Sequence, residues 1–224
     1  ISLGLVGSEM CIRDRTASAH LVQGVLACLV RRGCTGEGGR VEVSLLESIL
    51  DLQFEVITTH LNDGGQTPRR SAVRNAHAYL GAPYGIYATT DGHLALAMGS
   101  IPVLGALLEC PALLAFDDRQ SWFDQRDAIK AILRDHLRTA STAHWLARLE
   151  PADIWCAEVL DWPRLRETAG YRALDMEQEI LCPGGTPLQT LRCPIRIDGT
   201  ITKSPHGAPA IGQHTTQINT EFSL

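Results

Sequence analysis

Apolar residues in the first part of the chain follow a helical pattern with almost no polar side. Residues 16–32 are nearly all helix-compatible and carry apolar side chains around most of the helix. This pattern is typical of a buried helix that has a sheet on one side and another layer on the other. We expect the helix to stop at Gly33, because the glycines at 36–39 can adopt positive φ angles and let the chain reverse.

A strand and a second helix are expected next. Residues 40–44 alternate polar and apolar side chains, as a half-buried strand does. Ser44 and Glu47 have the spacing of a capping box, which predicts a helix from there to about Leu61. The order helix, glycine turn, strand and helix indicates part of an α/β layer.

The rest of the chain contains a connector and a second group of elements. A polar stretch without periodicity begins at residue 63 and predicts a linker. Two apolar runs flank Asp91 and Gly92, which predicts a hairpin over residues 86–98. Helical spacing follows over residues 122–137, and Ser141 is the expected cap of a further short helix. Residues 191–197 are strand-like and precede a turn at 198–199 and a glycine- and proline-rich tail.

Composition limits the class of partner and the compartment. The 224 residues include 20 Lys and Arg against 25 Asp and Glu, so no basic excess favours nucleic acid. No apolar run reaches the roughly 18 residues that a membrane span needs. Seven cysteines, an odd number without a C-x-x-C pair, favour reduced thiols in the cytoplasm.

Motifs for several kinds of chemistry are missing from the sequence. The eight histidines are scattered rather than grouped at ligand spacing, so we expect no metal site. The sequence also contains neither a phosphate-binding G-x-x-x-x-G-K-[ST] loop nor the G-x-S-x-G motif of a serine hydrolase.

The first fifteen residues differ in character from the remainder of the chain. The string ISLGLVGSEMCIRDR has no positively charged start and no small-residue cleavage site, so a signal peptide is not indicated. It resembles a translated sequencing-adapter read-through. We therefore expect residues 1–15 to be a non-native segment and leave them out of the fold expectations.

Residues 21–48 carry the pattern that points to a family. The apolar helix is followed by R-G-C-T-G-E-G-G and then V-E-V-S-L-L-E. This resembles the signature of class III coenzyme A (CoA) transferases of the CaiB/BaiF type, in which Gln is common where Gly39 stands and Asp where Glu42 stands. Formyl-CoA transferase and α-methylacyl-CoA racemase belong to the same superfamily. Residues 82–92, 145–159 and 207–215 resemble further family stretches in the same order.

The resemblance implies an α/β fold. This chain would be the C-terminal part of a Rossmann-like large domain with an inserted smaller α/β domain. Residues 16–62 would then be a large-domain segment, 63–81 the linker, 82–180 the small domain and 181–224 the return to the large domain. In the full-length parent, two subunits would interlock as a homodimer.

The resemblance also implies a reaction. Family members transfer CoA between an acyl-CoA and a carboxylic acid through an aspartyl acyl anhydride, with the thioester as substrate and no permanently bound cofactor. The family's catalytic aspartate stands just before the apolar helix, and Asp14 falls at that position although it lies inside the suspected adapter string. A glycine-bearing loop over the active site corresponds to residues 74–85. Its candidates for substrate contacts are Asn75, His77, Gly81, Tyr84 and Gly85.

Two other functions fit the same residues. An α-methylacyl-CoA racemase or epimerase of the same fold would exchange the α-proton with a His and Asp pair. A non-catalytic partial chain that only pairs with another subunit is the second alternative.

Overall fold

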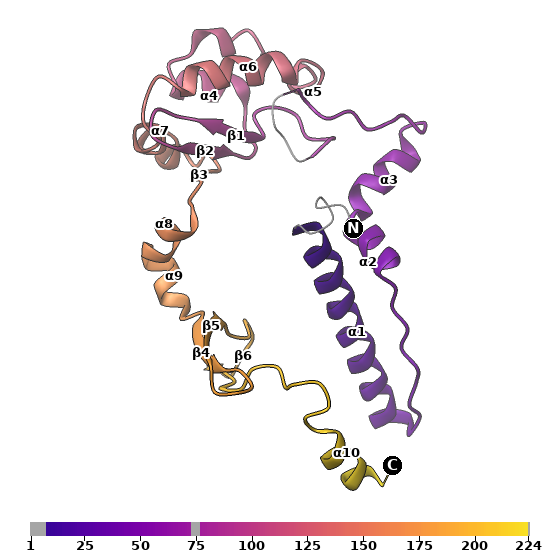
Figure 1. Ribbon diagram of the computed structural model, residues 1–224. Helices are drawn as coiled ribbons and strands as arrows, with labels where there is room; N and C mark the ends of the chain where they lie inside the picture. The colour runs from indigo at the N-terminus through magenta and orange to yellow at the C-terminus, as the bar shows by residue number, and fades with distance from the viewer. Residues whose placement is uncertain (1–7, 73–76, 224) are drawn as a thin grey trace. The chain divides into compact units, whose positions relative to one another are not determined.

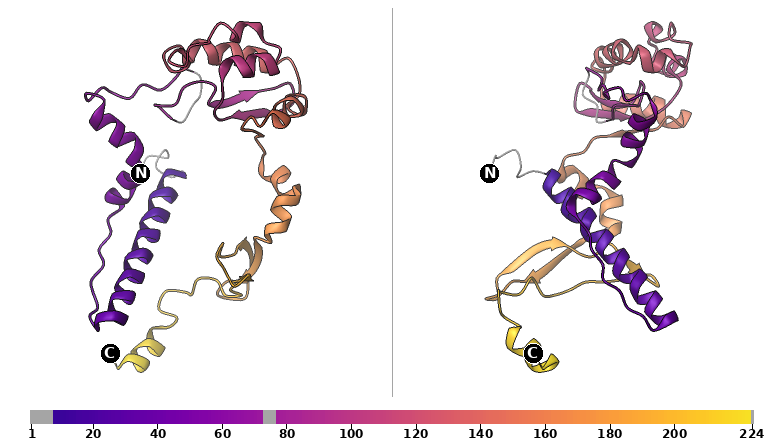
Figure 2. Two further views of the ribbon diagram at one scale, coloured as in Figure 1. Left: turned by 180° about the vertical axis from the view of Figure 1, so that it is seen from behind. Right: turned by 90° about the vertical axis from the view of Figure 1, so that its right-hand side faces the viewer.

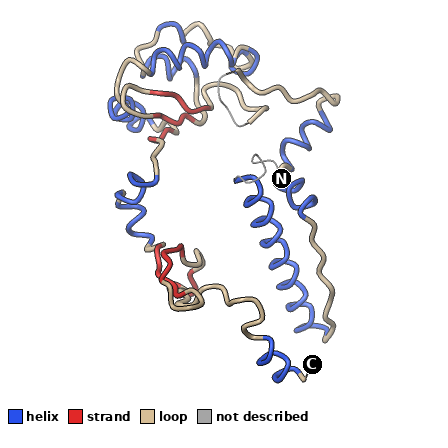
Figure 3. The backbone as a smooth tube through the Cα atoms, in the orientation of Figure 1, coloured by secondary structure: helices blue, strands red, loops and turns tan. Residues whose placement is uncertain are grey.

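The structure is a computed structural model that describes residues 8–72 and 77–223, with side chains from residue 12 onward (Figure 1). The chain forms two compact units that divide between Glu158 and Val159. Helices and strands occur in both units, which confirms the expected α/β class (Figure 3). No helix of the described residues is long and apolar enough to cross a membrane.

Three helices begin the first unit. Helix α1 spans Ser8–Thr35, and Gly36 follows it with φ 78°. The helix therefore continues two residues past the predicted stop at Gly33. Helices α2 (Leu45–Leu52) and α3 (Phe54–Asn62) follow with a break at one residue between them. The Ser44 hydroxyl accepts a hydrogen bond from the Glu47 amide at 3.1 Å, which confirms Ser44 as the helix cap. It also donates to the Glu47 carboxylate, whereas a capping box has that carboxylate accept the backbone amide of the cap residue.

The strand predicted for residues 40–44 is wrong. This segment is extended and lies beside α1, but it belongs to no sheet (Figure 2). It packs through Val41, and a Cβ added to Gly24 on α1 would lie 2.6 Å from a methyl carbon of that valine. A strand needs a neighbouring backbone for its N–H and C=O groups, and here a helix lies beside the segment instead.

The burial predicted for the first helix is also wrong for this chain. The large apolar side chains of α1 are between 43% and 69% exposed, with Val30 the most exposed. Helix α1 packs on α2, and no sheet covers it among the described residues. The exposed apolar side chains of α1 are Ile12, Leu21, Val22, Val25, Leu26, Leu29 and Val30.

A three-stranded antiparallel sheet organises the second half of the first unit. Strands β1 (Gly85–Ala88) and β2 (His93–Leu96) form the predicted hairpin, and β3 (Cys156–Glu158) pairs with β2. The main core lies here and includes Leu94 on β2 and Leu133 on helix α6, both 0% exposed. Alternating apolar positions on β2 face this core, which accounts for the hairpin signal in the sequence.

Short helices pack against this sheet. Ser141 caps α7 by accepting a hydrogen bond from the His144 amide at 3.2 Å, as predicted. The segment predicted as one helix over 122–137 is two helices that meet at Gln125. The elements are α4 (Ile101–Leu107), η2 (Pro111–Leu113), α5 (Ser121–Asp124), α6 (Arg126–Leu137), α7 (Thr142–Leu149) and η3 (Glu150–Ala152).

The second unit consists of small helices and two-stranded sheets. The predicted turn at 198–199 is confirmed, with positive φ at both residues. Only the ends of the strand-like stretch 191–197 belong to strands. The C-terminal tail after this stretch contains a helix that the sequence pattern did not predict. The elements are α8 (Trp162–Glu167), α9 (Ala169–Leu174), β4 (Glu177–Leu181), β5 (Pro187–Leu191), β6 (Arg196–Ile197), β7 (Thr200–Ile201) and α10 (Thr215–Phe222).

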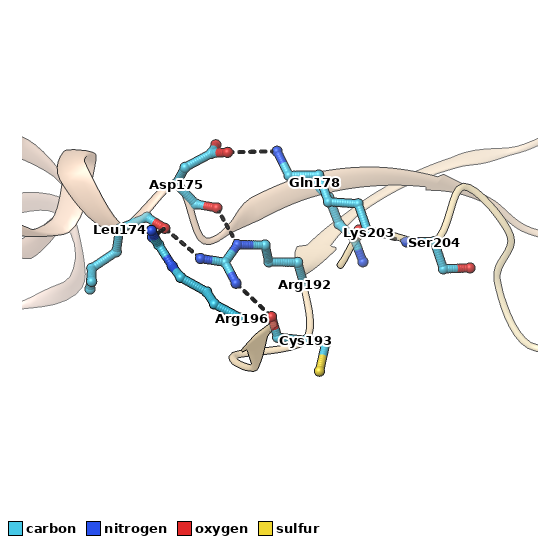
Figure 4. A network of polar contacts seen from close by, with 8 residues as sticks. All are labelled: Leu174, Asp175, Gln178, Arg192, Cys193, Arg196, Lys203 and Ser204. Carbon is cyan, nitrogen blue, oxygen red and sulfur yellow. Dashed lines mark hydrogen bonds and ion pairs between the residues drawn. The ribbon is translucent and has the colours of Figure 1, made fainter. Parts of the chain in front are cut away.

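A buried arginine joins α9 to the hairpin of β4 and β5. The guanidinium of Arg192 donates hydrogen bonds of 2.6 Å to the carbonyls of Leu174, Asp175 and Cys193 (Figure 4). Leu174 is the last residue of α9, so the arginine satisfies a carbonyl that the helix leaves unpaired. Its positive charge also lies at the negative end of the helix dipole.

Candidate functional site

Asp14 lies inside α1 rather than ahead of it. The helix starts at Ser8, so the predicted position just before a helix is wrong for this chain. Residues 8–15 contain no glycine or proline and therefore extend the helix toward the N-terminus. The Asp14 side chain is exposed, and its backbone carbonyl accepts a hydrogen bond from the Ser18 hydroxyl at 2.7 Å.

The imidazole of His77 is the best-defined polar group among the predicted loop residues. Its Nδ1 accepts a hydrogen bond from the Tyr79 amide at 3.2 Å, which leaves the proton of the neutral ring on Nε2. Nε2 lies 3.9 Å from a carboxylate oxygen of Glu55 on α3. The ring is half-buried, whereas the glutamate is exposed. The hydrogen bond from the Tyr79 amide therefore orients the imidazole, and the Glu55 carboxylate lies near its other nitrogen.

Tyr79 links the same loop to the end of α3. Its hydroxyl donates to a carboxylate oxygen of Asp63 at 3.3 Å. The other oxygen of that carboxylate accepts the amides of Gly65 and Gln66, which builds the turn after the helix. Burial, followed by the charge of Asp63, raises the pKa of the Tyr79 hydroxyl. The tyrosine therefore remains a neutral hydrogen-bond donor at physiological pH.

The glycines of the predicted loop lie where the backbone is tightly packed. A Cβ added to Gly81 would lie 2.9 Å from the carbonyl oxygen of Trp122, and one added to Gly85 would lie 3.3 Å from the Tyr87 hydroxyl. Gly85 also begins β1, and Tyr84 before it is half-buried. Asn75 lies outside the described residues. These glycines therefore allow close packing of the chain at the base of the loop.

His77, Tyr79, Glu55 and Asp63 form a polar cluster between the loop and α3. Three of its members were not predicted from the sequence as site residues. Glu55 and Tyr79 come from positions that no motif marks. The run Asp63-Gly64-Gly65 predicted only the start of a linker, and in the structure the aspartate accepts backbone amides there. The pairing of this turn with Tyr79, sixteen residues later, depends on tertiary structure.

The groups described above are suited to acid–base and nucleophilic chemistry. Among the described side chains, no three His, Cys, Asp or Glu residues are grouped so that they could hold a metal ion. An exposed carboxylate on α1 and an oriented imidazole in the loop are groups that can attack a carbonyl carbon or move a proton.

Curated relatives of the chain are CoA-transferases. The chain is 25% identical over 225 residues to the acetyl-CoA:oxalate CoA-transferase of Acetobacter aceti, covering 95% of this chain and 54% of the relative. It is 26% identical over 206 residues to the succinyl-CoA:mesaconate CoA-transferase of Haloarcula marismortui, covering 90% of this chain and 51% of the relative. The chain thus spans about half the length of the curated relatives it matches.

Solved structures share the fold. A CaiB/BaiF family protein from Brucella suis matches with a TM-score of 0.65 and 23% identity, over 92% of this chain and 54% of that one. The hypothetical protein Rv3272 from Mycobacterium tuberculosis matches with a TM-score of 0.69 and 20% identity, over 92% of this chain and 54% of that one.

The family assignment rests on a match along almost the whole chain. The sequence model of CoA-transferase family III covers residues 6–215, which include Asp14 and the loop that carries His77. The relatives and the fold comparison agree with that match. The chain belongs to CoA-transferase family III.

Proposed function

We propose that the full-length protein transfers CoA between an acyl-CoA and a carboxylic acid, with Asp14 as the nucleophile. The observation that carries this proposal is the family match from residue 6 onward, which includes Asp14, together with the exposure of its side chain. The substrates named for the curated relatives, acyl-CoA thioesters and carboxylic acids, support the same substrate classes here.

The proposed step is an attack of the Asp14 carboxylate on the thioester carbonyl. A C–O bond forms, the C–S bond breaks, and CoA leaves as a thiolate that carries the electron pair. The product is a mixed anhydride between the acyl group and the aspartate. The thiolate then attacks the aspartyl carbonyl, which releases the donor carboxylate and leaves CoA as a thioester on Asp14. The acceptor carboxylate attacks this thioester, the thiolate leaves again, and a second anhydride forms between Asp14 and the acceptor. Attack of the thiolate on the acceptor carbonyl gives the new acyl-CoA and restores the Asp14 carboxylate, so one difficult exchange becomes several easier ones.

The proposal also covers the compartment, the oligomeric state and the activity of the chain alone. We propose a cytoplasmic protein, and the six cysteines that are free among the described residues agree with a reducing compartment. The full-length parent would be an interlocked homodimer. The 224-residue chain alone would be inactive, because it spans about half of the matched relatives.

Trapping tests the nucleophile. The full-length protein is incubated with acyl-CoA and hydroxylamine, and peptides are analysed by mass spectrometry. We expect a hydroxamate on the peptide that contains Asp14, because hydroxylamine captures an activated acyl aspartate. Asp14→Asn should give no hydroxamate and lower turnover by several orders of magnitude, as loss of a covalent nucleophile does. Asp135→Asn is the control, since Asp135 is an exposed carboxylate paired with Arg134 on α6.

A deuterium experiment separates the alternatives. Incubation of a chiral 2-methylacyl-CoA in deuterated water without an acceptor acid should give no α-deuterium. Incorporation of α-deuterium would reject the proposed CoA transfer and support the racemase alternative. Turnover by the purified 224-residue chain would exclude both a purely pairing role and the proposed inactivity of the chain alone.

A further inference from the structure

The turn that ends α3 holds a carboxylate in a defined orientation. Asp63 follows the last residue of the helix, and its Oδ1 accepts the amides of Gly65 and Gln66 at 3.1 and 3.2 Å. Nδ1 of His60, in the last turn of α3, donates to the carbonyl of Gln66 at 2.8 Å and ties the turn back to the helix. Local contacts alone therefore orient the Asp63 side chain.

The other oxygen of this carboxylate contacts a residue sixteen positions later. Oδ2 of Asp63 accepts the hydroxyl of Tyr79 at 3.3 Å. Both side chains are half-buried, so water competes for this hydrogen bond less than it would at an open surface. Tyr79 is thereby attached through its side chain to the end of α3.

The backbone amide of the same tyrosine contacts His77. It donates to Nδ1 at 3.2 Å, and the two rings lie edge to face with their centres 6.4 Å apart. A backbone N–H can only donate, so this hydrogen bond exists only while Nδ1 carries no proton. The position of the Tyr79 amide therefore selects the tautomer of His77 that has its proton on Nε2.

Glu55 lies near the other nitrogen of the imidazole. One of its carboxylate oxygens is 3.9 Å from Nε2 of His77, which is too long for a hydrogen bond. A negative charge there favours a proton on Nε2, but the Glu55 side chain is 79% exposed and solvent screens its charge. The directional contact with the Tyr79 amide is therefore the stronger constraint on the tautomer.

We propose that Asp63, acting through Tyr79, is a positioning residue that fixes the tautomer of His77. With its proton on Nε2, the imidazole can donate to an oxygen of a substrate carboxylate or thioester, whereas the other tautomer offers only an acceptor at that nitrogen. The importance of this donor for catalysis rests on the proposed CoA-transferase function, in which His77 belongs to the substrate loop. The tautomer itself is a property of the fold.

Nitrogen NMR of the full-length protein with ¹⁵N-labelled histidine tests the tautomer. Spectra are recorded at about pH 8.5, roughly two units above the ordinary histidine pKa, and His77→Gln identifies the signals of this ring by their loss. We expect an unprotonated Nδ1 and a protonated Nε2 in the native protein. Tyr79→Phe removes only the hydroxyl, and the two nitrogen signals of His77 should move toward each other as the second tautomer appears.

A second variant breaks the same contact from the side of the helix. Asp63→Asn retains an oxygen for the turn and places an amide nitrogen opposite the Tyr79 hydroxyl, so it should move the His77 signals in the same direction. In both variants we expect the amide of residue 79 to exchange about fivefold faster, as for loss of one hydrogen bond. The amide of Leu133, in the core on α6, should keep its protection and so report an intact fold.

Tyr171→Phe is the matched control. Tyr171 is also half-buried, and its hydroxyl donates to the Glu177 carboxylate at 2.9 Å in the second unit, so its loss should leave the His77 signals in place. Glu55→Gln removes the charge near Nε2 and should keep the tautomer.

Three results would overturn the proposal. They are a native His77 with its proton on Nδ1, signals that stay in place in both Tyr79→Phe and Asp63→Asn, and a mixture of tautomers in Glu55→Gln alone. No readout uses substrate, so failure to trap a hydroxamate on Asp14 would reject the proposed function without affecting this result.

Discussion

The carboxylate of Asp91 accepts the backbone amide of Thr142 at 2.8 Å and so joins the hairpin turn to the start of α7. The same oxygen accepts the hydroxyls of Thr89 and Thr142, both at 3.1 Å. The sequence marks Asp91 only as a turn residue. In the structure its carboxylate also accepts the Thr142 amide, which has no acceptor within the helix because it lies in the first turn of α7.

Replacement of Asp91 should therefore destabilise the part of the first unit that contains β1, β2 and β3. Asp91→Ala leaves the Thr142 amide and two hydroxyls without this acceptor, and we expect the thermal midpoint to fall by roughly several degrees. Differential scanning calorimetry is the measurement. Asp117→Ala, a change at an exposed aspartate outside this network, should leave the midpoint within about one degree. Equal midpoints for the two variants would contradict the role of Asp91.

Low pH should weaken the contact between Asp91 and Thr142. Hydrogen bonds, the Thr142 amide first, lower the pKa of Asp91 below its ordinary value. A carboxyl whose pKa is lower in the folded state contributes stability above its unfolded pKa and loses it as pH falls through the folded pKa. The difference in unfolding free energy between the native chain and Asp91→Ala should shrink as pH falls below about 4. Urea titrations at a series of pH values measure it, and a constant difference would reject the prediction.

Lys130 should have the opposite pH dependence. Its folded pKa of about 8 lies below the ordinary 10.5, so the unfolded chain binds more protons between these values. The free energy of unfolding should then rise with pH from about 8 to about 10.5, by at most about 3 kcal/mol. Lys130→Met should lack this rise and be at least as stable as the native chain at pH 7. Urea unfolding of both proteins at pH 7 and pH 10 is the measurement. If the free energy of unfolding changes with pH by the same amount in both, Lys130 does not titrate in this range.

The exposed apolar side of α1 should make the isolated chain self-associate. Val22 and Val30 are 56% and 69% exposed, within a row of large apolar side chains. We expect light scattering to show oligomers or aggregates that decrease in Val22→Gln/Val30→Gln. Val103→Gln on α4 changes a valine of similar exposure, 50%, outside this row and should leave association unchanged. A monodisperse monomer with a cooperative melt would contradict the prediction.

Local sequence determined those elements whose partners lie within a few residues. The Ser44 cap, the hairpin turn at Asp91 and Gly92 and the Ser141 cap all depend on contacts within one turn. Residue type and spacing are enough to specify such contacts. The family signature in residues 21–48 likewise predicted the family to which the chain belongs.

Tertiary structure decided the features that join distant residues. Residues 40–44 alternate like a strand, yet a helix lies beside them, whereas residues 156–158 form β3 because β2 offers its edge. The burial of Lys130 and Arg192 follows from a hydroxyl and carbonyls supplied by other segments. Such pairings depend on which distant segment lies next to the residue in the folded chain. Neither hydrophobic periodicity nor local propensity contains that information.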